Sequence, residues 1–283
     1  FILLLIIRAQ NYKNFYIHYS YISAGNASLI AKLSGARTFY WSCGMMWLFG
    51  KDRALGLVLK LINHLVTGVK ALKSGYVEHY GISVDKIKIM PNWIDLNRFN
   101  NIDTDNILEK YKLNKDDKYI FFVHRLAKRK GAHYIAKLAK TNPEFKFLIA
   151  GDGPYKKQLE QEIKDLDNVI LLGKIPNKDI PGLMRISKLF FMPSEEEGFP
   201  RVLLESMAAG LPYVAFDIGG VREISTKEQQ EYIVDDVASM NIGIKEILSN
   251  QDIYNKLKQV NLEHVKQFDI KVVKNKFIEL IYG

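Results

Sequence analysis

Cysteine is almost absent from this sequence of 283 residues. Cys43 is its single cysteine, which excludes an internal disulfide and a metal site built from four cysteines. Such cysteine usage is typical of a reducing compartment, so we expect a cytoplasmic protein.

Long apolar runs are missing as well. The longest, residues 1–7, is too short to cross a bilayer and lacks the basic start of a signal peptide, so it is predicted to be a buried strand.

The composition is that of a folded soluble chain, with 48% apolar and 25% charged residues, and the length allows two domains.

The net charge of +9 is unevenly distributed along the chain. Residues 1–100 hold 12 Lys or Arg against 4 Asp or Glu, whereas residues 101–283 hold 28 against 27. This asymmetry predicts an acidic partner for the N-terminal part. Because we find no nucleic-acid motif, we favour an anionic membrane surface.

Residues 193–224 carry the densest pattern in the chain. The apolar run 188–192 predicts a buried strand, which ends in Pro193, Ser194 and three glutamates. Pro200 is suited to open a helix, and Gly210 and Pro212 form a stop signal for it. Residues 213–216 predict the next strand. Gly219 and Gly220 after it allow a second loop to pass close to a ligand.

Two successive strand-loop-helix units place their loops at the same edge of a parallel sheet, where helix N-termini attract anions. Glu197 and Glu205 stand eight positions apart, and carboxylates accept hydrogen bonds from the hydroxyls of a sugar or ribose. A nucleotide sugar combines hydroxyls with phosphates and therefore suits this edge. The alternative is that these glutamates are solvated surface charges.

The pattern closely resembles the donor-site signature of the retaining glycosyltransferases of family 4, the glycosyl transferases group 1. The matching residues are Glu197-Gly198-Phe199, Glu205, the run 207–212 and Gly219-Gly220. The resemblance implies an α/β fold of two Rossmann-like domains facing a cleft, known as GT-B, in which the C-terminal domain holds the nucleotide sugar. It also implies that Glu197 lies by the donor sugar, with the N–H groups of Gly198 and Phe199, and that Glu205 binds the ribose.

The strand predicted at residues 119–123 delivers a basic loop to the same edge. Arg125 offers a planar fork for phosphate oxygens and Lys130 a mobile point charge, although a basic loop can also be merely solvated. The resembled family has matching residues as its diphosphate clamp. Ile175, after a strand at residues 169–172, lies in a segment that resembles the loop whose backbone recognises the nucleotide base.

The N-terminal part alternates strand and helix, with strands predicted at residues 15–19 and 38–41. Many relatives carry a histidine before a glycine at the end of the second of these strands, and here Cys43 and Gly44 match that pair. His18, at the end of the first strand, is either a residue facing the cleft or a structural histidine.

A run of large apolar residues follows Gly44, and its role can be interpreted in two ways. Residues 45–49 either fill the core or enter a membrane surface beside Lys51, Arg53 and Lys60. Arg53 and Lys60 belong to a basic amphipathic helix predicted at residues 52–65, and Lys51 directly precedes it.

We expect a partial, acceptor-side domain over residues 1–99, a nucleotide-sugar-binding domain over residues 100–265, and a C-terminal helix over residues 266–283 that returns toward the first domain. The resembled family has a glycine-rich loop after its first strand, and none precedes residue 20. We therefore expect the first domain to be incomplete through N-terminal truncation.

Asp103-Thr104-Asp105 resembles a metal-binding aspartate pair, but helix capping is the better interpretation.

The sequence thus predicts an enzyme that moves a sugar from a nucleoside-diphosphate sugar to a hydroxyl acceptor, glycan or lipid-linked, with retention. It would need no metal or other cofactor and would work in polysaccharide or glycolipid biosynthesis, peripherally at the inner face of the membrane. Two alternatives stay open: a nucleotide-sugar epimerase or phosphorylase of the same architecture, and a nucleotide-sugar-binding fragment without catalysis.

Overall fold

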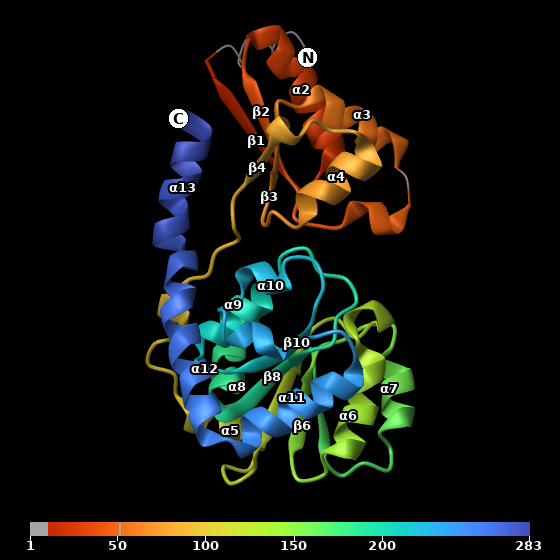
Figure 1. The fold of residues 1–283 in the computed structure, drawn as a ribbon, viewed down its shortest axis with the longest axis vertical. Coiled ribbons are helices and arrows are strands. Elements are labelled where there is room, and N and C mark those ends of the chain that lie inside the picture. The colour runs from red at the N-terminus through yellow and green to blue at the C-terminus, as the bar shows by residue number, and fades with distance from the viewer. Residues whose placement is uncertain (1–10, 51) are drawn as a thin grey trace. The chain divides into compact units, whose positions relative to one another are not determined.

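The computed structural model in Figure 1 describes residues 11–50 and 52–283. The strand predicted at residues 1–7, and Lys51, lie outside the described residues. The chain forms two α/β units. One comprises the described residues up to Asn92 together with Glu197–Phe199 and Lys271–Gly283, and the other comprises Trp93–Glu196 and Pro200–Ile270.

The first unit is built on a sheet of four parallel strands in the order β1-β2-β3-β4. The strands are β1 (Asn14–His18), β2 (Arg37–Trp41), β3 (His64–Thr67) and β4 (Ile87–Ile89), and the connecting helices are α2 (Tyr21–Ser34), α3 (Arg53–Leu61) and α4 (Leu72–Tyr80). Each crossover moves one strand in the same direction, so right-handed connections place these helices on one face of the sheet. The final helix α13 (Ile270–Tyr282) packs on β1, where the rings of Tyr16 and Phe277 lie 4.9 Å apart.

The helix predicted at residues 52–65 is confirmed over Arg53–Leu61, but its last four residues are wrong. Asp52 caps α3 through its carboxylate, as a helix start requires, but the helix ends at Leu61 and β3 begins at His64. The side chain of Asn63 explains the change, because its Oδ1 accepts the backbone N–H of Thr38 in β2 at 2.8 Å. Bonding to a neighbouring strand competes with helix continuation. Helix α4 was not predicted either.

The second unit is built on six parallel strands in the order β10-β9-β8-β5-β6-β7. They are β5 (Tyr119–Val123), β6 (Lys146–Ala150), β7 (Val169–Gly173), β8 (Ser187–Met192), β9 (Tyr213–Phe216) and β10 (Ile233–Val234). The strands predicted at residues 119–123, 188–192 and 213–216 are thereby confirmed, and the α/β fold class with two Rossmann-like units is as expected. The strand order reverses between β5 and β8, and doubly wound sheets generally bind their ligands at the carboxyl ends of the strands at such a point.

Helices cover both faces of this second sheet. They are α5 (Thr104–Tyr111), α6 (Ile135–Thr141), α7 (Lys156–Glu162), α8 (Ile180–Ile186), α9 (Arg201–Ala208), α10 (Val221–Ile224), α11 (Val237–Ser249) and α12 (Gln251–His264). Ile120 and Phe122 point into a core shared with α6, α7 and α11, while Phe121 between them points to the opposite face. Asp103 caps α5 by accepting the N–H of Asn106, which confirms the capping interpretation.

Candidate functional site

The loops after β5 and β8 are joined to each other at the switch point. Lys130 donates from Nζ to the carbonyl oxygen of Glu196 at 2.6 Å, and Arg129 donates from Nη1 to both carboxylate oxygens of Glu196 at 3.1 Å. The backbone N–H of Glu195 in turn donates to the carbonyl oxygen of Arg129 at 3.0 Å. The predicted phosphate-binding Lys130 is therefore anchored to the segment that leads to Glu197.

Gly131 allows this close approach. Its φ is +75°, and a Cβ there would lie 2.0 Å from the carbonyl oxygen of Pro193. A side chain would both strain the backbone and collide with a main-chain atom, so only glycine fits. The Lys130-Gly131 pair matters because the glycine lets the lysine lie against the neighbouring loop.

Arg125 and Ile175 share an open pocket of about 710 Å³ at the carboxyl ends of β5, β6 and β7. Asp152, Lys174 and Asn177 also line it. The pocket therefore brings together two of the predicted donor-site residues. Arg125 is the cation, and Ile175 belongs to the proposed base-recognition loop. Lys130 and Glu205 are not among the described residues that line it.

The glycines of the loop after β6 place the backbone of this pocket. A Cβ on Gly151 would lie 1.9 Å from the carbonyl oxygen of His124, and one on Gly153 would lie 2.3 Å from that of Leu126. In the sequence, Gly-Asp-Gly is a weak turn signal. In the structure, both glycines are required because the loop after β6 packs closely against the loop after β5.

Glu205 lies within α9 and is mostly buried, with 14% of its side chain exposed. Its Oε1 is 3.8 Å from Nη1 of Arg98. Burial raises the pKa of the Glu205 carboxyl, and the nearby charges of Arg98 and Arg201 act in the opposite direction. A buried carboxylate with a cation beside it is not the solvated surface charge of the alternative interpretation.

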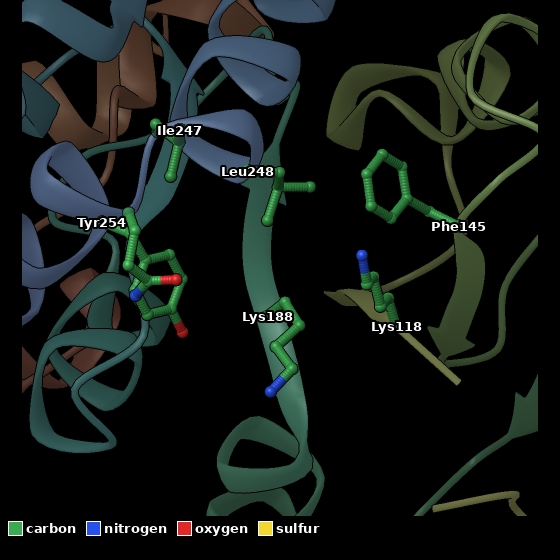
Figure 2. A pocket seen from close by; sticks show the side chains of 7 residues that line it. Lys118, Phe145, Lys188, Ile247, Leu248 and Tyr254 are labelled. Carbon is green, nitrogen blue, oxygen red and sulfur yellow. The ribbon is translucent and has the colours of Figure 1, made fainter. Parts of the chain in front are cut away.

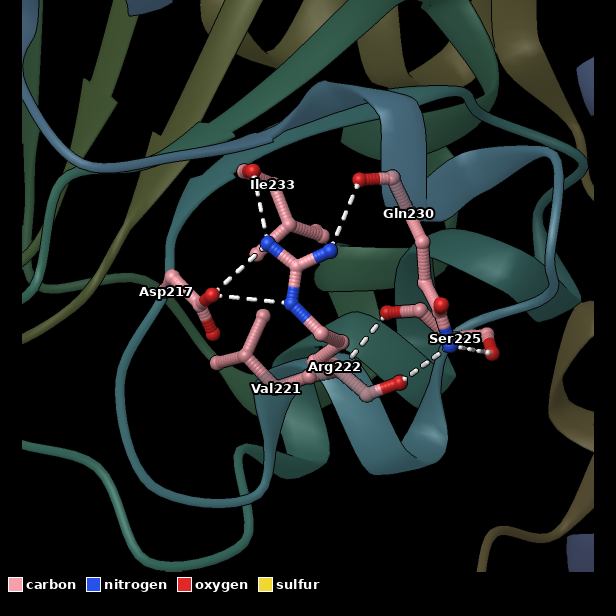
Figure 3. A network of polar contacts seen from close by, with 6 residues as sticks. All are labelled: Asp217, Val221, Arg222, Ser225, Gln230 and Ile233. Atoms are coloured by element: carbon pink, nitrogen blue, oxygen red, sulfur yellow. Dashed lines mark hydrogen bonds and ion pairs between the residues drawn. The ribbon is translucent and has the colours of Figure 1, made fainter.

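The Gly219-Gly220 loop follows β9 and leads into α10, and Gly219 has a φ of +55°. Figure 3 shows the network that holds this loop. Arg222 donates from Nε to Asp217 Oδ2 at 2.8 Å and from Nη2 to the carbonyl oxygen of Ile233 in β10 at 3.1 Å. Sequence reasoning missed Asp217 and Arg222, whose signal was their opposite charges on either side of the glycine pair.

In the first unit, Cys43 is buried at the end of β2. Its Sγ accepts a hydrogen bond from Nε1 of Trp41 at 2.6 Å, and burial raises the pKa of the thiol to about 12. The backbone of Glu197–Phe199, which belongs to the same unit, touches this residue, because a Cβ on Gly198 would lie 1.6 Å from the carbonyl oxygen of Cys43. Glu197 itself is 8% exposed.

His18 ends β1 as predicted, among aromatic rings. Its ring centroid lies 4.0 Å from that of Tyr19 and 5.5 Å from that of Trp41. Desolvation lowers the pKa of this imidazole, which favours the neutral form. These contacts fit the structural interpretation of His18, and a role in binding stays a prediction.

The apolar run after Gly44 forms a short 3-10 turn over Met46–Phe49 that lies against α4. The ring of Trp47 stacks on His79 at 5.5 Å and meets Tyr76 edge-on at 5.2 Å. A Cβ on Gly75 would lie 2.3 Å from the Trp47 ring, so this indole is committed to packing within its own unit. Leu48 is half exposed.

A smaller pocket of about 280 Å³ lies at the opposite edge of the second sheet (Figure 2). Lys118 and Lys188 stand at the start of β5 and β8, and Phe145, Leu248 and Tyr254 line the pocket with them. Because it opens at the amino ends of the strands, it is separate from the candidate donor site.

Within residues 11–50 and 52–283, no group of three or more His, Cys, Asp or Glu side chains is placed to hold a metal ion. In the same ranges, no helix is both long and apolar enough to span a membrane.

Comparison with solved structures identifies the class. The chain superposes on that of Anabaena Alr3699/HepE, solved in complex with UDP, with a TM-score of 0.87 over 99% of this chain and 81% of that one, at 19% identity. It also superposes on the sucrose-phosphate synthase of Thermosynechococcus elongatus, with a TM-score of 0.82 over 99% of this chain and 76% of that one, at 17% identity. The fold is that of the GT-B glycosyltransferases.

The family follows from the sequence of the second unit. Residues 103–263 match the model of glycosyl transferases group 1, and the chain belongs to this family. The putative teichuronic acid biosynthesis glycosyltransferase TuaC of Bacillus subtilis is 30% identical over 144 residues, which are 50% of this chain and 36% of TuaC. An Escherichia coli UDP-Gal:alpha-D-GlcNAc-diphosphoundecaprenol alpha-1,3-galactosyltransferase is 30% identical over 164 residues, 53% of this chain and 41% of that enzyme. The chain thus matches half or less of the length of these relatives.

The environment of Cys43 predicts an unreactive thiol. Because the thiolate is the reactive form and a pKa of about 12 leaves almost none of it at pH 8, the native protein should react with Ellman's reagent far more slowly than a free thiol. In 6 M guanidinium chloride one thiol per chain should react at once. Rapid labelling of the native protein would contradict the buried position.

Proposed function

We propose that this protein transfers a sugar from a nucleoside-diphosphate sugar to a hydroxyl acceptor, with retention at the anomeric carbon and without a metal ion, as a member of family 4. The observation that carries the proposal is the switch point between β5 and β8, where the basic loop containing Arg125 and Lys130 adjoins the segment before α9, the helix of Glu205. Cations and a buried carboxylate at this crevice suit the diphosphate and ribose of one ligand.

In this proposal each residue acts on one part of the donor. Arg125 and Lys130 stabilise the departing diphosphate, on which negative charge grows in the transition state. Glu205 accepts hydrogen bonds from the ribose hydroxyls, and the backbone around Ile175 receives the base. Gly219 and Gly220 let their loop approach the donor closely.

The reaction itself exchanges one bond at the anomeric carbon. The bond to the diphosphate oxygen breaks, the acceptor oxygen forms the new bond, and the hydroxyl proton leaves with the diphosphate. Glu197 supplies a carboxylate near the positive charge that develops on the sugar. The backbone N–H groups of Gly198 and Phe199 orient the sugar.

The relatives support the same donor and acceptor classes. Alr3699/HepE was solved with UDP, and the Escherichia coli relative is named for a UDP-sugar donor and a diphosphoundecaprenol acceptor. We therefore infer a UDP-sugar as donor and a lipid-linked or glycan acceptor, in polysaccharide or glycolipid synthesis at the cytoplasmic face of a membrane.

A nucleotide-sugar-binding module without transferase activity is the second candidate. The pocket of Arg125 and Ile175 and the buried Glu205 all belong to the second unit, so binding of the nucleotide would not by itself require the first unit. Binding without turnover would distinguish it from the transferase.

On the first unit, the apolar side chains that support membrane association are not those of the expected run 45–49. Five large aliphatic side chains on α2 and α3 are between 47% and 67% exposed: Ile22, Leu29, Leu33, Leu57 and Leu61. They lie on the sides of the two helices opposite the buried Ala24, Ala31 and Leu59. Because both helices cover the same face of the sheet, these five side chains point away from it, and we name this set the α2–α3 face.

The charges on these helices suit an anionic surface. Lys32 on α2 and Arg53 and Lys60 on α3 are exposed, and neither helix contains an acidic residue. Each basic residue near an anionic bilayer adds about 1 kcal/mol, and the aliphatic side chains add apolar burial. We infer that the α2–α3 face, rather than Trp47, contacts the membrane.

The cationic pair should determine donor affinity. Replacing Arg125 or Lys130 by Ala removes a charge-assisted phosphate contact of about 1.5–3 kcal/mol, so the Kd for UDP should rise at least tenfold. Isothermal calorimetry measures this. The matched control is Lys128→Ala in the same loop, which removes an exposed charge and should leave the Kd unchanged. Equal affinity in all three variants would refute the assignment.

Transfer of a sugar is the decisive test of the function. We expect the wild-type protein, incubated with a panel of nucleoside-diphosphate sugars and a lipid-linked acceptor, to yield a product heavier by one sugar in mass spectrometry. Glu197→Gln should reduce turnover while sparing UDP affinity, whereas Glu205→Gln should chiefly weaken UDP binding. Donor binding with no product from any acceptor would favour the binding module instead.

The α2–α3 face should govern binding to vesicles. The wild-type protein should sediment with phosphatidylglycerol-containing liposomes at low salt and be released at high salt, because exposed charges are screened. Leu29→Ser with Leu57→Ser, or Arg53→Glu with Lys60→Glu, should abolish this binding. Ile242→Ser on α11, a side chain 65% exposed, is the control and should retain it. Binding that ignores lipid charge would contradict the proposal.

A further inference from the structure

Arg98 lies in a short 3-10 turn, Leu96–Phe99, at the start of the second unit. Its guanidinium contacts two segments that are far apart in the sequence. Nη2 donates to the carbonyl oxygen of Asn177 at 2.7 Å, and Nη1 lies 3.8 Å from Oε1 of Glu205. Sequence reasoning did not single out this residue.

The turn that carries Arg98 is held from several sides. Asp95 accepts the backbone N–H of Asn97 at 3.0 Å, and Arg185 of α8 donates to the carbonyl oxygen of Phe99 at 3.0 Å. The Phe99 side chain is buried. The backbone N–H of Ile94 donates to the carbonyl oxygen of Phe268, and the carbonyl oxygen of Ile94 accepts the N–H of Ile270, the first residue of α13. Because its turn is anchored, the guanidinium has a defined place between its two partners.

Those two partners belong to the two halves of the proposed nucleoside site. Asn177 lines the pocket that contains Arg125 and Ile175, where the base would lie, and Glu205 is the proposed ribose ligand. A planar guanidinium can donate to a carbonyl from one nitrogen while another nitrogen stays beside a carboxylate, an arrangement that a lysine ammonium on a flexible stem does not fix.

The charge of Arg98 also acts on Glu205. Burial raises the pKa of this carboxyl, and the charges that oppose the shift are Arg98 from the turn and Arg201 from the same helix. Arg98 therefore favours the ionised carboxylate, the form that accepts hydrogen bonds from hydroxyls with both oxygens.

We propose that Arg98 is a positioning residue for the nucleoside of the donor: it holds the Glu205 carboxylate and the Asn177 carbonyl in register, so that ribose and base are received together. This role rests on the proposed function. It adds to that function a residue that acts through Glu205 and Asn177 rather than by touching the diphosphate.

The test is calorimetry of the full chain with three probes: UDP, 2′,3′-dideoxyuridine diphosphate and inorganic pyrophosphate. Arg98→Ala should raise the Kd for UDP about tenfold and leave that for pyrophosphate unchanged, because the diphosphate clamp is intact. The wild-type preference for UDP over the dideoxy probe should shrink in the variant. Arg98→Lys keeps the charge beside Glu205 and should recover part of the UDP affinity.

Two further variants sharpen the comparison. Arg37→Ala is the matched control, because Arg37 also donates to a backbone carbonyl, that of Ile281 at 3.1 Å, but belongs to the first unit. It should bind all three probes as the wild type does. In a Glu205→Gln background, Arg98→Ala should have a smaller effect than alone, since coupled residues are not additive.

The outcomes distinguish failure of the positioning role of Arg98 from failure of the proposed function. If Arg98→Ala binds UDP as tightly as the wild type, or weakens pyrophosphate to the same degree as UDP, the positioning role is refuted while the donor site stands. If the wild-type protein binds neither UDP nor GDP nor ADP, the proposed function fails and the role of Arg98 fails with it.

Discussion

The candidate site depends on the reversal of strand order between β5 and β8. In a parallel sheet the connections on the two sides of such a point cover opposite faces, so the loops at the carboxyl ends diverge and leave room for a ligand. Here the two loops diverge but stay bonded, through Lys130 and the backbone of Glu196. Gly131 permits that approach, because any side chain there would meet the carbonyl oxygen of Pro193.

Two charged side chains of the candidate site, Glu205 and Arg125, differ in their exposure to solvent. Glu205 is desolvated within α9 and is accompanied by Arg98, whereas the loop cation Arg125 lies exposed at an open pocket. A buried acceptor beside a cation is suited to neutral hydroxyls, and an exposed cation is suited to a phosphate that arrives from water. The proposed roles of Glu205 at the ribose and of Arg125 at the diphosphate rest on these two environments.

Much of the second unit could be predicted from sequence, because each of its central strands is a short apolar run bounded by glycine, proline or charge. Such a run, too short for most helices, suits a strand buried on both faces of a covered parallel sheet. The same reasoning failed at residues 62–65, since an apolar run directly after a helix is consistent with continuation of that helix. The bond from Asn63 to Thr38 in the adjacent strand decided for β3, and no local pattern contains that partner.

The sequence by itself determined the fold class, the family resemblance and the chemical types of Arg125, Lys130, Glu197 and Glu205, because spacing and residue type are local properties. Tertiary structure alone decided which residues three of these side chains contact or share a pocket with. It placed Arg125 and Ile175 in one pocket, bonded Lys130 to Glu196, and brought Arg98 between Asn177 and Glu205. It also turned Trp47 onto α4 and left aliphatic side chains of α2 and α3 exposed. Contacts between distant segments depend on how strands pair and helices pack, which one-dimensional patterns do not contain.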